Sequence, residues 1–336
     1  MRIPFPTVQA ELARILIKHD FTPARAELCA RLFAETSLDG VYSHGLNRFP
    51  LFIEYIRKGY VKIHAVPEMA ASFGALERWD GNWGPGNLNA FFCMQRAIAL
   101  AQQHGMGGVA LRHTNHWLRG GTYGWQAAAA GCLAICFTNT IGNMPPWGGV
   151  GCKIGNNPLV LAVPRSEGHI VLDMAMSLYS YGKMSVYRDK QELLPFDGGY
   201  DQEGNLTRDP GEILAAKCPL PIGYWKGAGL SVLLDLFAAI LSDGRSVPVI
   251  GSIDDPQAEE IGLSQVFLCF DLRQQEQSAI MARVTKDVVD FIHAARPLKE
   301  GEQVYYPGER TRLTRQENLA CGIPVDDALW EKVLAL

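Results

Sequence analysis

Residues 87–111 read NLNAFFCMQRAIALAQQHGMGGVAL. Residues 87–104 have the apolar spacing of a helix that ends at Gly105, and Val109-Ala110-Leu111 then has the composition of a short buried strand. The same order follows at once, because a helical pattern over 122–130 is closed by Gly131 and precedes an apolar strand over 133–137. Alternating helices and short apolar strands predict an α/β core.

The flanking regions predict a helical unit built from both ends of the chain. Before the core, the helical patterns cover 7–18, 23–38 and 52–57, and a last helix over 326–334 is expected to pack back on them. Further predicted elements are strands over 158–164, 170–174 and 266–270 and helices over 230–241 and 278–295. The segment 185–225 shows little periodicity, so we expect it to cross the surface as an extended excursion. We therefore expect a helical unit of 1–75 and 300–336, and an α/β core of 76–299.

Composition and motifs narrow the function classes. Lys and Arg number 31 against 35 Asp and Glu, a net charge of −4, and the charges are interspersed, which disfavours a general attraction to nucleic acid or anionic membranes. No apolar run approaches the ~20 residues of a membrane span, and the 8 cysteines form no Cys-x-x-Cys pair, so we expect reduced core cysteines in a cytoplasmic protein. No glycine-rich segment both follows a strand and opens a helix, so any dinucleotide site must be of a non-Rossmann type.

Residues 41–50, VYSHGLNRFP, are the first candidate for chemistry. His44 can exchange a proton near neutral pH, and Arg48 offers a fixed fork of donors for a carboxylate, so the pair suits an anionic substrate with a reactive carbonyl. An equally simple interpretation makes His44 a helix-terminal histidine bonded to a backbone carbonyl. Lys226, before Gly227-Ala228-Gly229, suits a phosphate at a helix N-terminus or marks only a tight glycine turn.

A second candidate is His113-Thr114-Asn115-His116. We expect His116 to line a pocket at a strand end and His113 to be a packed or surface residue. One alternative is a metal-dependent hydrolase that uses His113 and His116, although a zinc site needs more ligands than these two. Another is a non-catalytic protein that binds an acid sugar without turnover.

Several segments together resemble the type-2 malate/L-lactate dehydrogenase family from end to end. They are Tyr42-Ser43-His44-Gly45, Asn115-His116, Thr138-Asn139, Pro145-Pro146-Trp147-Gly148, Gly155-Asn156-Asn157-Pro158, Asp173-Met174, Gly223-Tyr224-Trp225-Lys226-Gly227 and Pro307-Gly308-Glu309. The resemblance implies a cytoplasmic homodimer with a non-Rossmann nicotinamide-binding fold, a mixed-sheet core and no metal. Asn156 and the His113-Thr114 pair depart from the pattern of the nearest relatives, which bears on substrate specificity.

The resemblance also implies roles for individual residues. His44 would be the proton donor. From side-chain chemistry we further expect Arg48 to hold the substrate carboxylate, His116 to assist catalysis, and Ser43 and Asn115 to bind substrate. The resemblance also places the cofactor. Cofactor contacts would come from His169, Ile170, Val171, Leu172, Asp173, Met174, Ala175, Trp225, Lys226, Gly308, Glu309 and Arg310.

The nearest branch of the family reduces the C2 carbonyl of 2,3-diketo sugar acids with NADH, and NADPH remains an alternative cofactor. Malate, L-lactate and ureidoglycolate dehydrogenases are the alternatives within the family.

Overall fold

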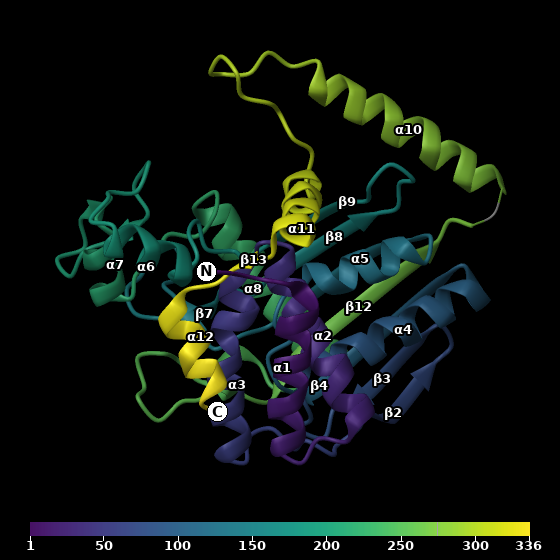
Figure 1. The fold of residues 1–336 in the computed structure, drawn as a ribbon, viewed down its shortest axis with the longest axis horizontal. Helices are drawn as coiled ribbons and strands as arrows, with labels where there is room; N and C mark the ends of the chain where they lie inside the picture. The colour runs from purple at the N-terminus through teal and green to yellow at the C-terminus, as the bar shows by residue number, and fades with distance from the viewer. Residues whose placement is uncertain (274) are drawn as a thin grey trace.

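The core is a mixed sheet of seven strands in the order β2-β3-β4-β12-β5-β8-β9 (Figure 1). The structure is a computed structural model that describes residues 1–273 and 275–336. The seven strands are β2 (Glu68–Phe73), β3 (Leu76–Asp80), β4 (Met106–Thr114), β5 (Cys132–Thr138), β8 (Leu159–Val163), β9 (Ile170–Met174) and β12 (Leu263–Asp271). Only β3 and β4 pair in parallel, and the other neighbours are antiparallel. The predicted α/β class with a mixed sheet is therefore confirmed.

Both faces of the sheet are covered by helices. Val109 and Leu111 of β4 point to the face that carries α4 (Gly86–His104) and α5 (Gly121–Ala129). Ala110 points to the opposite face, where it packs with α8 (Trp225–Ser242). This alternation is the two-residue period of a strand, and burial on both sides explains why the sequence is apolar without interruption here. The helix-strand order predicted for 87–137 is confirmed.

The two ends of the chain form one hydrophobic cluster. Helix α1 (Phe5–Lys18) contributes Val8, Leu12, Ile15 and Leu16, the expected apolar stripe. The cluster also includes α2 (Pro23–Leu38), α3 (Phe49–Arg57) and, as predicted, the last helix α12 (Asp327–Leu334), while β1 (Arg2–Ile3) pairs with β13 (Ile323–Pro324). The division into 1–75 with 300–336 and 76–299 remains our proposal for the domain boundaries.

The segment 185–225 is more structured than the sequence suggested. It contains most of α6 (Tyr181–Asp189), the strand pair β10 (Gly199–Tyr200) and β11 (Leu206–Thr207), and α7 (Pro210–Ala216). A small core joins α6 to α7. The prediction of an extended excursion was wrong because these elements are too short to show a period. The remaining short elements are η1 (Tyr42–His44), η2 (Leu46–Arg48), β6 (Gly142–Met144), β7 (Ile154–Gly155) and α9 (Val247–Ile250).

Two helices present apolar side chains to the outside. Helix α10 (Gln275–His293) extends away from the body of the molecule (Figure 1), and α11 (Glu309–Cys321) returns the chain to it. The other is α8, which by length and composition alone is apolar enough to cross a membrane, although helices of globular cores also meet that criterion. The sequence predicted this helix over 230–241, but not its membrane-like length and composition, because Lys226 and Asp235 interrupt the apolar run. Of the cysteines, all free, seven are buried and Cys321 is exposed, so the expectation of core cysteines fails at that position.

Candidate active site

His44 is held on a tight connection between α2 and α3. It closes η1, and Gly45 follows it directly against α2. A Cβ on Gly45 would lie 2.2 Å from Ser37 Oγ, so only glycine allows this approach. The same Ser37 hydroxyl accepts a hydrogen bond from the Leu46 backbone N–H at 2.8 Å. The Ser-His-Gly segment is therefore fixed by backbone packing, which orients the imidazole.

The structure brings His116 onto His44. His116 follows β4, and the two imidazoles stack with ring centroids 5.8 Å apart and an interplanar angle of 27°. His116 Nδ1 accepts the Leu118 backbone N–H at 3.0 Å, so the ring proton of neutral His116 lies on Nε2. His44 Nδ1 lies 2.9 Å from Ser43 Oγ. Neutral His116 is consequently a hydrogen-bond donor through Nε2.

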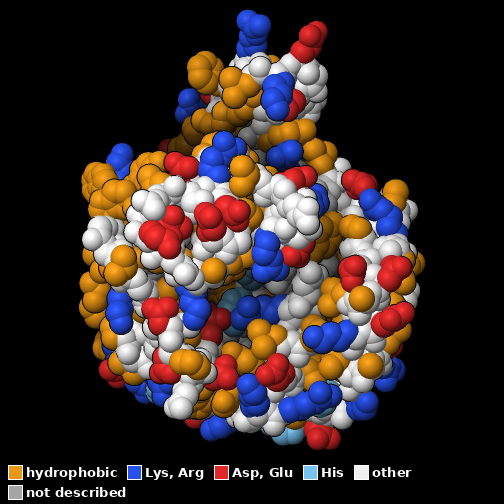
Figure 2. Space-filling view, turned by 90° about the vertical axis from the view of Figure 1, so that its left-hand side faces the viewer, with side chains coloured by type: hydrophobic (Ala, Val, Ile, Leu, Met, Phe, Trp, Pro, Cys, Tyr) orange, Lys and Arg blue, Asp and Glu red, His pale blue; other side chains and the backbone are white. Residues whose placement is uncertain are grey.

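Both histidines border a cavity of about 350 Å³ that reaches β9. Its other lining residues include Arg119, Asp173 and Gly308. Figure 2 shows a hollow in one face of the molecule, with histidine and basic side chains at its floor. Arg119 is buried and forms ion pairs with Asp39 and, at 3.7 Å, with Asp173. The cavity therefore joins the predicted proton donor to the predicted cofactor strand.

Burial and positive charge keep both histidines neutral. Desolvation, followed by the charges of Arg48 and Arg119, lowers the pKa of His44 to about 4. Desolvation and Arg48 also lower the pKa of His116 well below its usual value. Asp173 is shifted the other way, because burial raises the pKa of its carboxyl group. At neutral pH the free protein thus holds two uncharged imidazoles beside two guanidinium groups.

Arg48 already has a carboxylate partner within the chain. Its guanidinium pairs with Glu260 at 3.0 Å, and the two side chains are only 24% and 15% exposed. The neighbouring Glu259 accepts the Tyr55 hydroxyl at 2.8 Å and pairs with Lys58 at 3.2 Å. A ligand carboxylate could therefore bind Arg48 only by displacing Glu260 or by sharing the guanidinium with it. No sequence pattern indicated this pair, because its members are separated by 212 positions.

Ser43 and Asn115, the other predicted substrate contacts, differ in which polar atoms are free to bind a ligand. Ser43 is exposed and its hydroxyl contacts only His44 among the described residues. Asn115 is buried, and its Nδ2 donates to the carbonyl oxygens of Tyr60, Trp83 and Gly84 at 2.9 to 3.2 Å. Its Oδ1 has no hydrogen-bond partner in the described chain. Asn115 thus acts as a support for the surrounding loops and offers a ligand only an acceptor.

The predicted cofactor residues divide into two groups. His169 to Ala175 run along β9, and the Val171 N–H donates to Pro307 O at 2.9 Å, which places the Pro-Gly-Glu turn on this strand. Glu309 caps that turn by accepting the Tyr306 N–H at 3.2 Å and lies 2.9 Å from His293 Nε2. Trp225 and Lys226 are exposed at the start of α8 and do not line this cavity.

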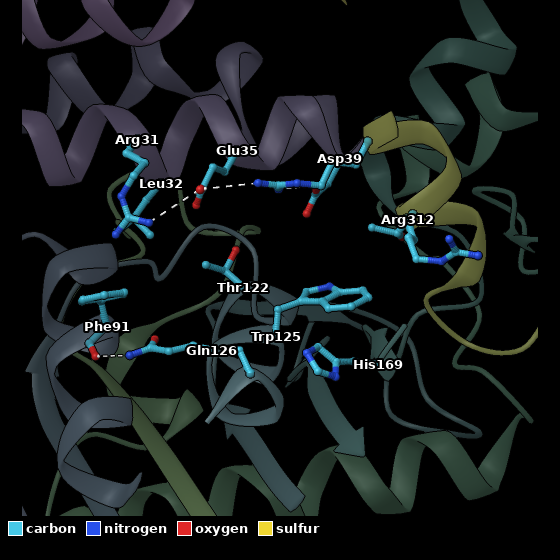
Figure 3. A pocket seen from close by; sticks show the side chains of 13 residues that line it. Arg31, Leu32, Glu35, Asp39, Phe91, Thr122, Trp125, Gln126, His169 and Arg312 are labelled. Atoms are coloured by element: carbon cyan, nitrogen blue, oxygen red, sulfur yellow. Dashed lines mark hydrogen bonds and ion pairs between the residues drawn. The ribbon is translucent and has the colours of Figure 1, made fainter. Parts of the chain in front are cut away.

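Polar groups without a partner gather near β9. Among the described residues, Trp125 Nε1 and Arg312 Nε (Figure 3) are buried without a hydrogen bond, and Arg119 Nε, which faces Asp173 Oδ2 at 3.7 Å, also lacks one. Buried donors in native proteins are rarely left unpaired, so an unpaired group calls for a missing partner. Arg119 lies within the Arg-Gly-Gly cluster visible in the sequence, but no signal pointed to Trp125 or Arg312. A polar ligand along β9 fits these residues.

The histidine pair of the hydrolase alternative is split between two environments. His113 lies 2.9 Å from Asp80 Oδ2 and stacks on Trp83, whereas His116 stacks on His44. Within the part of the chain that the structure describes, no group of three or more His, Cys, Asp or Glu side chains is placed to hold a metal ion.

Known proteins match this chain over its full length. The family model described as malate/L-lactate dehydrogenase matches residues 3–334. A 2,3-diketo-L-gulonate reductase of Citrobacter koseri is 44% identical over 336 residues, which are 100% of both chains. Among solved structures, the sulfolactate dehydrogenase of Methanocaldococcus jannaschii is similar with a TM-score of 0.90 at 26% identity, covering 100% of this chain and 98% of that one. The malate dehydrogenase of Pyrococcus horikoshii has a TM-score of 0.88 at 26% identity, covering 99% and 93%. The chain therefore belongs to the malate/L-lactate dehydrogenase family, and it is an oxidoreductase that acts on small hydroxy or keto acids with a nicotinamide cofactor.

Proposed function

We propose that this protein reduces the C2 carbonyl of 2,3-diketo-L-gulonate to give 3-keto-L-gulonate, with NADH as the reductant. The substrate is carried over from the reductase of that name that is 44% identical over the whole chain. The structural observation that supports the reaction is the stacked pair of His44 and His116 in a cavity that reaches β9.

In this proposal the bound reduced nicotinamide supplies a hydride to the carbonyl carbon. His44 transfers a proton to the carbonyl oxygen, a general-acid step of order 10² to 10⁴ in rate. His116, held neutral with its proton on Nε2, donates a hydrogen bond to the same oxygen as negative charge develops. Such a donor stabilises charge in the transition state without having to ionise.

Arg48 fixes which carbonyl reacts. Its guanidinium binds the C1 carboxylate and, together with His116 and Asn115, borders a small void beside the main cavity. When the substrate enters, Glu260 gives up its ion pair with Arg48. Ser43, hydrogen-bonded to His44 Nδ1, completes the substrate contacts and helps hold the ring.

The cofactor residues follow from the same placement. We propose contacts along His169 to Ala175 and on Gly308, Glu309 and Arg310, because that turn lies on β9 beside the unpaired donors. A contact with Trp225 or Lys226 would have to be made from the rim of the cavity or from a second copy of the chain, since both are exposed. NADH rather than NADPH is part of the proposal, as is a cytoplasmic location, where reduced cofactor is supplied.

A homodimer is proposed on the basis of two uncovered apolar faces. On α10, Ile280, Val284, Val288 and Phe291 lie at helical spacing and are 45 to 84% exposed. On α8, Leu233, Phe237 and Ile240 are 51, 54 and 67% exposed. Contiguous apolar surface of this kind marks association sites, and a second copy would cover it.

The decisive experiment is a panel of 2-keto and 2,3-diketo acids assayed with NADH and NADPH by the loss of absorbance of the reduced cofactor. The proposal expects the highest kcat/KM for 2,3-diketo-L-gulonate with NADH. A higher value for oxaloacetate, pyruvate or oxalurate would reassign the protein to malate, L-lactate or ureidoglycolate chemistry within the same family.

Two variants test the roles at the site. Arg48→Lys keeps the charge but loses the fork, so KM for the acid should rise while that for NADH stays constant. His44→Asn should lower kcat and leave cofactor binding intact. An unchanged kcat in a folded, cofactor-saturated His44→Asn protein would place the acid elsewhere.

A further inference from the structure

Trp83 lies on the loop between β3 and α4, and its indole ring contacts three segments that are distant in the sequence. The imidazole of His113, on β4, stacks on the indole with ring centroids 5.4 Å apart and an interplanar angle of 9°. The guanidinium carbon of Arg245 lies 4.8 Å from the ring centroid, within the range of a cation–π contact. A Cβ on Gly262 would be 2.8 Å from the ring, so the backbone before β12 packs directly against the indole. We call the contacts of His113, Arg245 and Gly262 with this ring the Trp83 clamp.

The backbone of this loop has an uncommon conformation. Asn82 and Trp83 have φ angles of +51° and +62°, and His113 has a φ of +49°. Residues other than glycine rarely adopt this left-handed region, and a bulky side chain makes it more costly. Such conformations persist only where surrounding contacts enforce them, and they concentrate at functional sites. The Trp83 clamp supplies contacts of this kind, so it holds a backbone that tryptophan would not adopt by itself.

The strained loop presents its carbonyl groups to Asn115. Asn115 Nδ2 donates to the carbonyl oxygens of Trp83 and Gly84, each at 2.9 Å. The Trp83 carbonyl also accepts the Lys62 N–H at 2.9 Å, and the Trp83 N–H donates to the His113 carbonyl at 2.7 Å. Asn115 is buried. The place of its side chain therefore depends on where the clamp holds the Trp83 backbone.

Asn115 is followed directly by His116, whose imidazole stacks on that of His44. On the other side, Leu118 has a φ of +68° and donates its N–H to His116 Nδ1 at 3.0 Å. His116 thus lies between two strained segments, one of which is tied to it through Asn115. A shift of Asn115 would move the His116 ring relative to His44, and a misplacement of about 1 Å is enough to lower an enzymatic rate substantially.

We propose that Trp83 is a positioning residue for His116. The clamp on its ring sets the carbonyl oxygen that anchors Asn115, and so sets the place of the His116 imidazole. This inference rests on the proposed function, in which His116 donates a hydrogen bond to the reacting carbonyl oxygen. It gives Trp83, His113 and Arg245 a part in catalysis that the family resemblance did not assign, although none of them touches the substrate.

Trp83→Gly tests the clamp, because glycine adopts a positive φ without strain and keeps the backbone carbonyl while the indole is lost. We expect kcat to fall about tenfold, while KM for the acid and Kd for NADH change by less than about twofold. Asn82→Gly is the matched control, since it relieves the neighbouring strained residue without touching the clamp, and it should retain the kcat of the unmodified protein.

Two milder variants keep the test independent of folding. Trp83→Phe retains an aromatic ring against His113 and Arg245 and should keep most of the kcat that Trp83→Gly loses. His113→Asn removes the stacked imidazole, and asparagine tolerates a positive φ, so kcat should fall by a smaller factor than in Trp83→Gly. An unchanged kcat in Trp83→Gly and His113→Asn would overturn the inference.

A double-mutant cycle with His116→Ala separates positioning from a general structural role. If Trp83 acts through His116, adding Trp83→Gly to His116→Ala should lower kcat little further. The same tenfold loss in both backgrounds would overturn the inference.

Amide hydrogen exchange tests the same geometry without turnover. The Leu118 N–H, which is bonded to His116 Nδ1, should exchange at least about tenfold faster in Trp83→Gly than in Asn82→Gly. Equal exchange would overturn the inference even if no acid is reduced. A His116→Ala protein with full kcat would instead refute the catalytic role proposed for His116, and faster exchange at Leu118 would then still support the positioning by Trp83.

Discussion

The protonation of His44 makes the sharpest prediction, because the proposed acid has its proton only in a small fraction of free molecules. With a pKa of about 4, roughly one molecule in a thousand is protonated at pH 7. The kcat/KM for reduction follows the protonated fraction of the free enzyme. It should therefore rise about tenfold for each unit by which the pH falls between about pH 8 and pH 5. Oxidation of the hydroxy acid, which needs the neutral base, should be nearly independent of this group over that range.

For His44 to act as the acid at neutral pH, substrate binding must raise its pKa. Half-protonation at pH 7 requires the pKa of His44 to rise by about three units, or about 4 kcal/mol. Two opposite charges about 4 Å apart at an effective dielectric constant of 20 interact by about 4 kcal/mol, so one substrate carboxylate beside the ring is sufficient. It would act by offsetting Arg48, one of the two cations that lower this pKa.

Calorimetry with oxamate, a keto-acid analogue that is not reduced, measures this proton directly. In buffers of different ionisation enthalpy, binding to the cofactor-loaded enzyme at pH 7 should take up about half a proton per site, because His44 changes from almost wholly neutral to half-protonated. His44→Asn should abolish the uptake, whereas His104→Asn, an exposed control at the end of α4, should retain it. A kcat/KM that stays flat between about pH 5 and pH 8, or equal uptake by His44→Asn, would refute the assignment of His44 as acid.

Three further variants test other parts of the structure. Glu260→Gln should lower KM for the acid about fivefold in steady-state kinetics, because a neutral hydrogen bond to Arg48 replaces a charged one. The exposed control Glu192→Gln should leave KM unchanged. A higher KM in Glu260→Gln would mean that Glu260 supports substrate binding. Gly308→Ala should lower the free energy of urea unfolding by about 1 kcal/mol more than Gly204→Ala. Both glycines have a positive φ, +92° and +85°, but a Cβ on Gly308 would lie 3.0 Å from Val171 N, whereas one on Gly204 would meet no atom within 4 Å. Equal losses of stability would contradict this close contact. Ile240→Asp should dissociate the proposed dimer in sedimentation experiments. The control Ile17→Asp changes a side chain that is 50% exposed on α1 and should leave the dimer intact. An unchanged dimer in Ile240→Asp would exclude the α8 face as the dimer interface.

Local pattern located several of the longer elements, but it missed α11, with 13 residues, and the strands β2 and β3. The helix of 87–104, the strand at 109–111 and the closing helix of 326–334 all lie where their apolar spacing put them. The segment 185–225 failed because two-residue strands and a seven-residue helix leave no period to detect. Side-chain chemistry likewise identified His44, Arg48 and His116 as candidates, but not how they are arranged.

The sequence by itself determined the helix-strand order of 87–137, the family and a histidine four positions before an arginine, because each of these depends on residues that are near one another in the chain. The tertiary structure decided that His44 stacks on His116, that Glu260 occupies Arg48, and that burial with Arg48 and Arg119 strips His44 of its proton. It also decided which buried side-chain groups, such as Trp125 Nε1, are left without a hydrogen bond among the described residues. These properties depend on distance and solvent exclusion between segments far apart in the chain, and only folding sets those quantities.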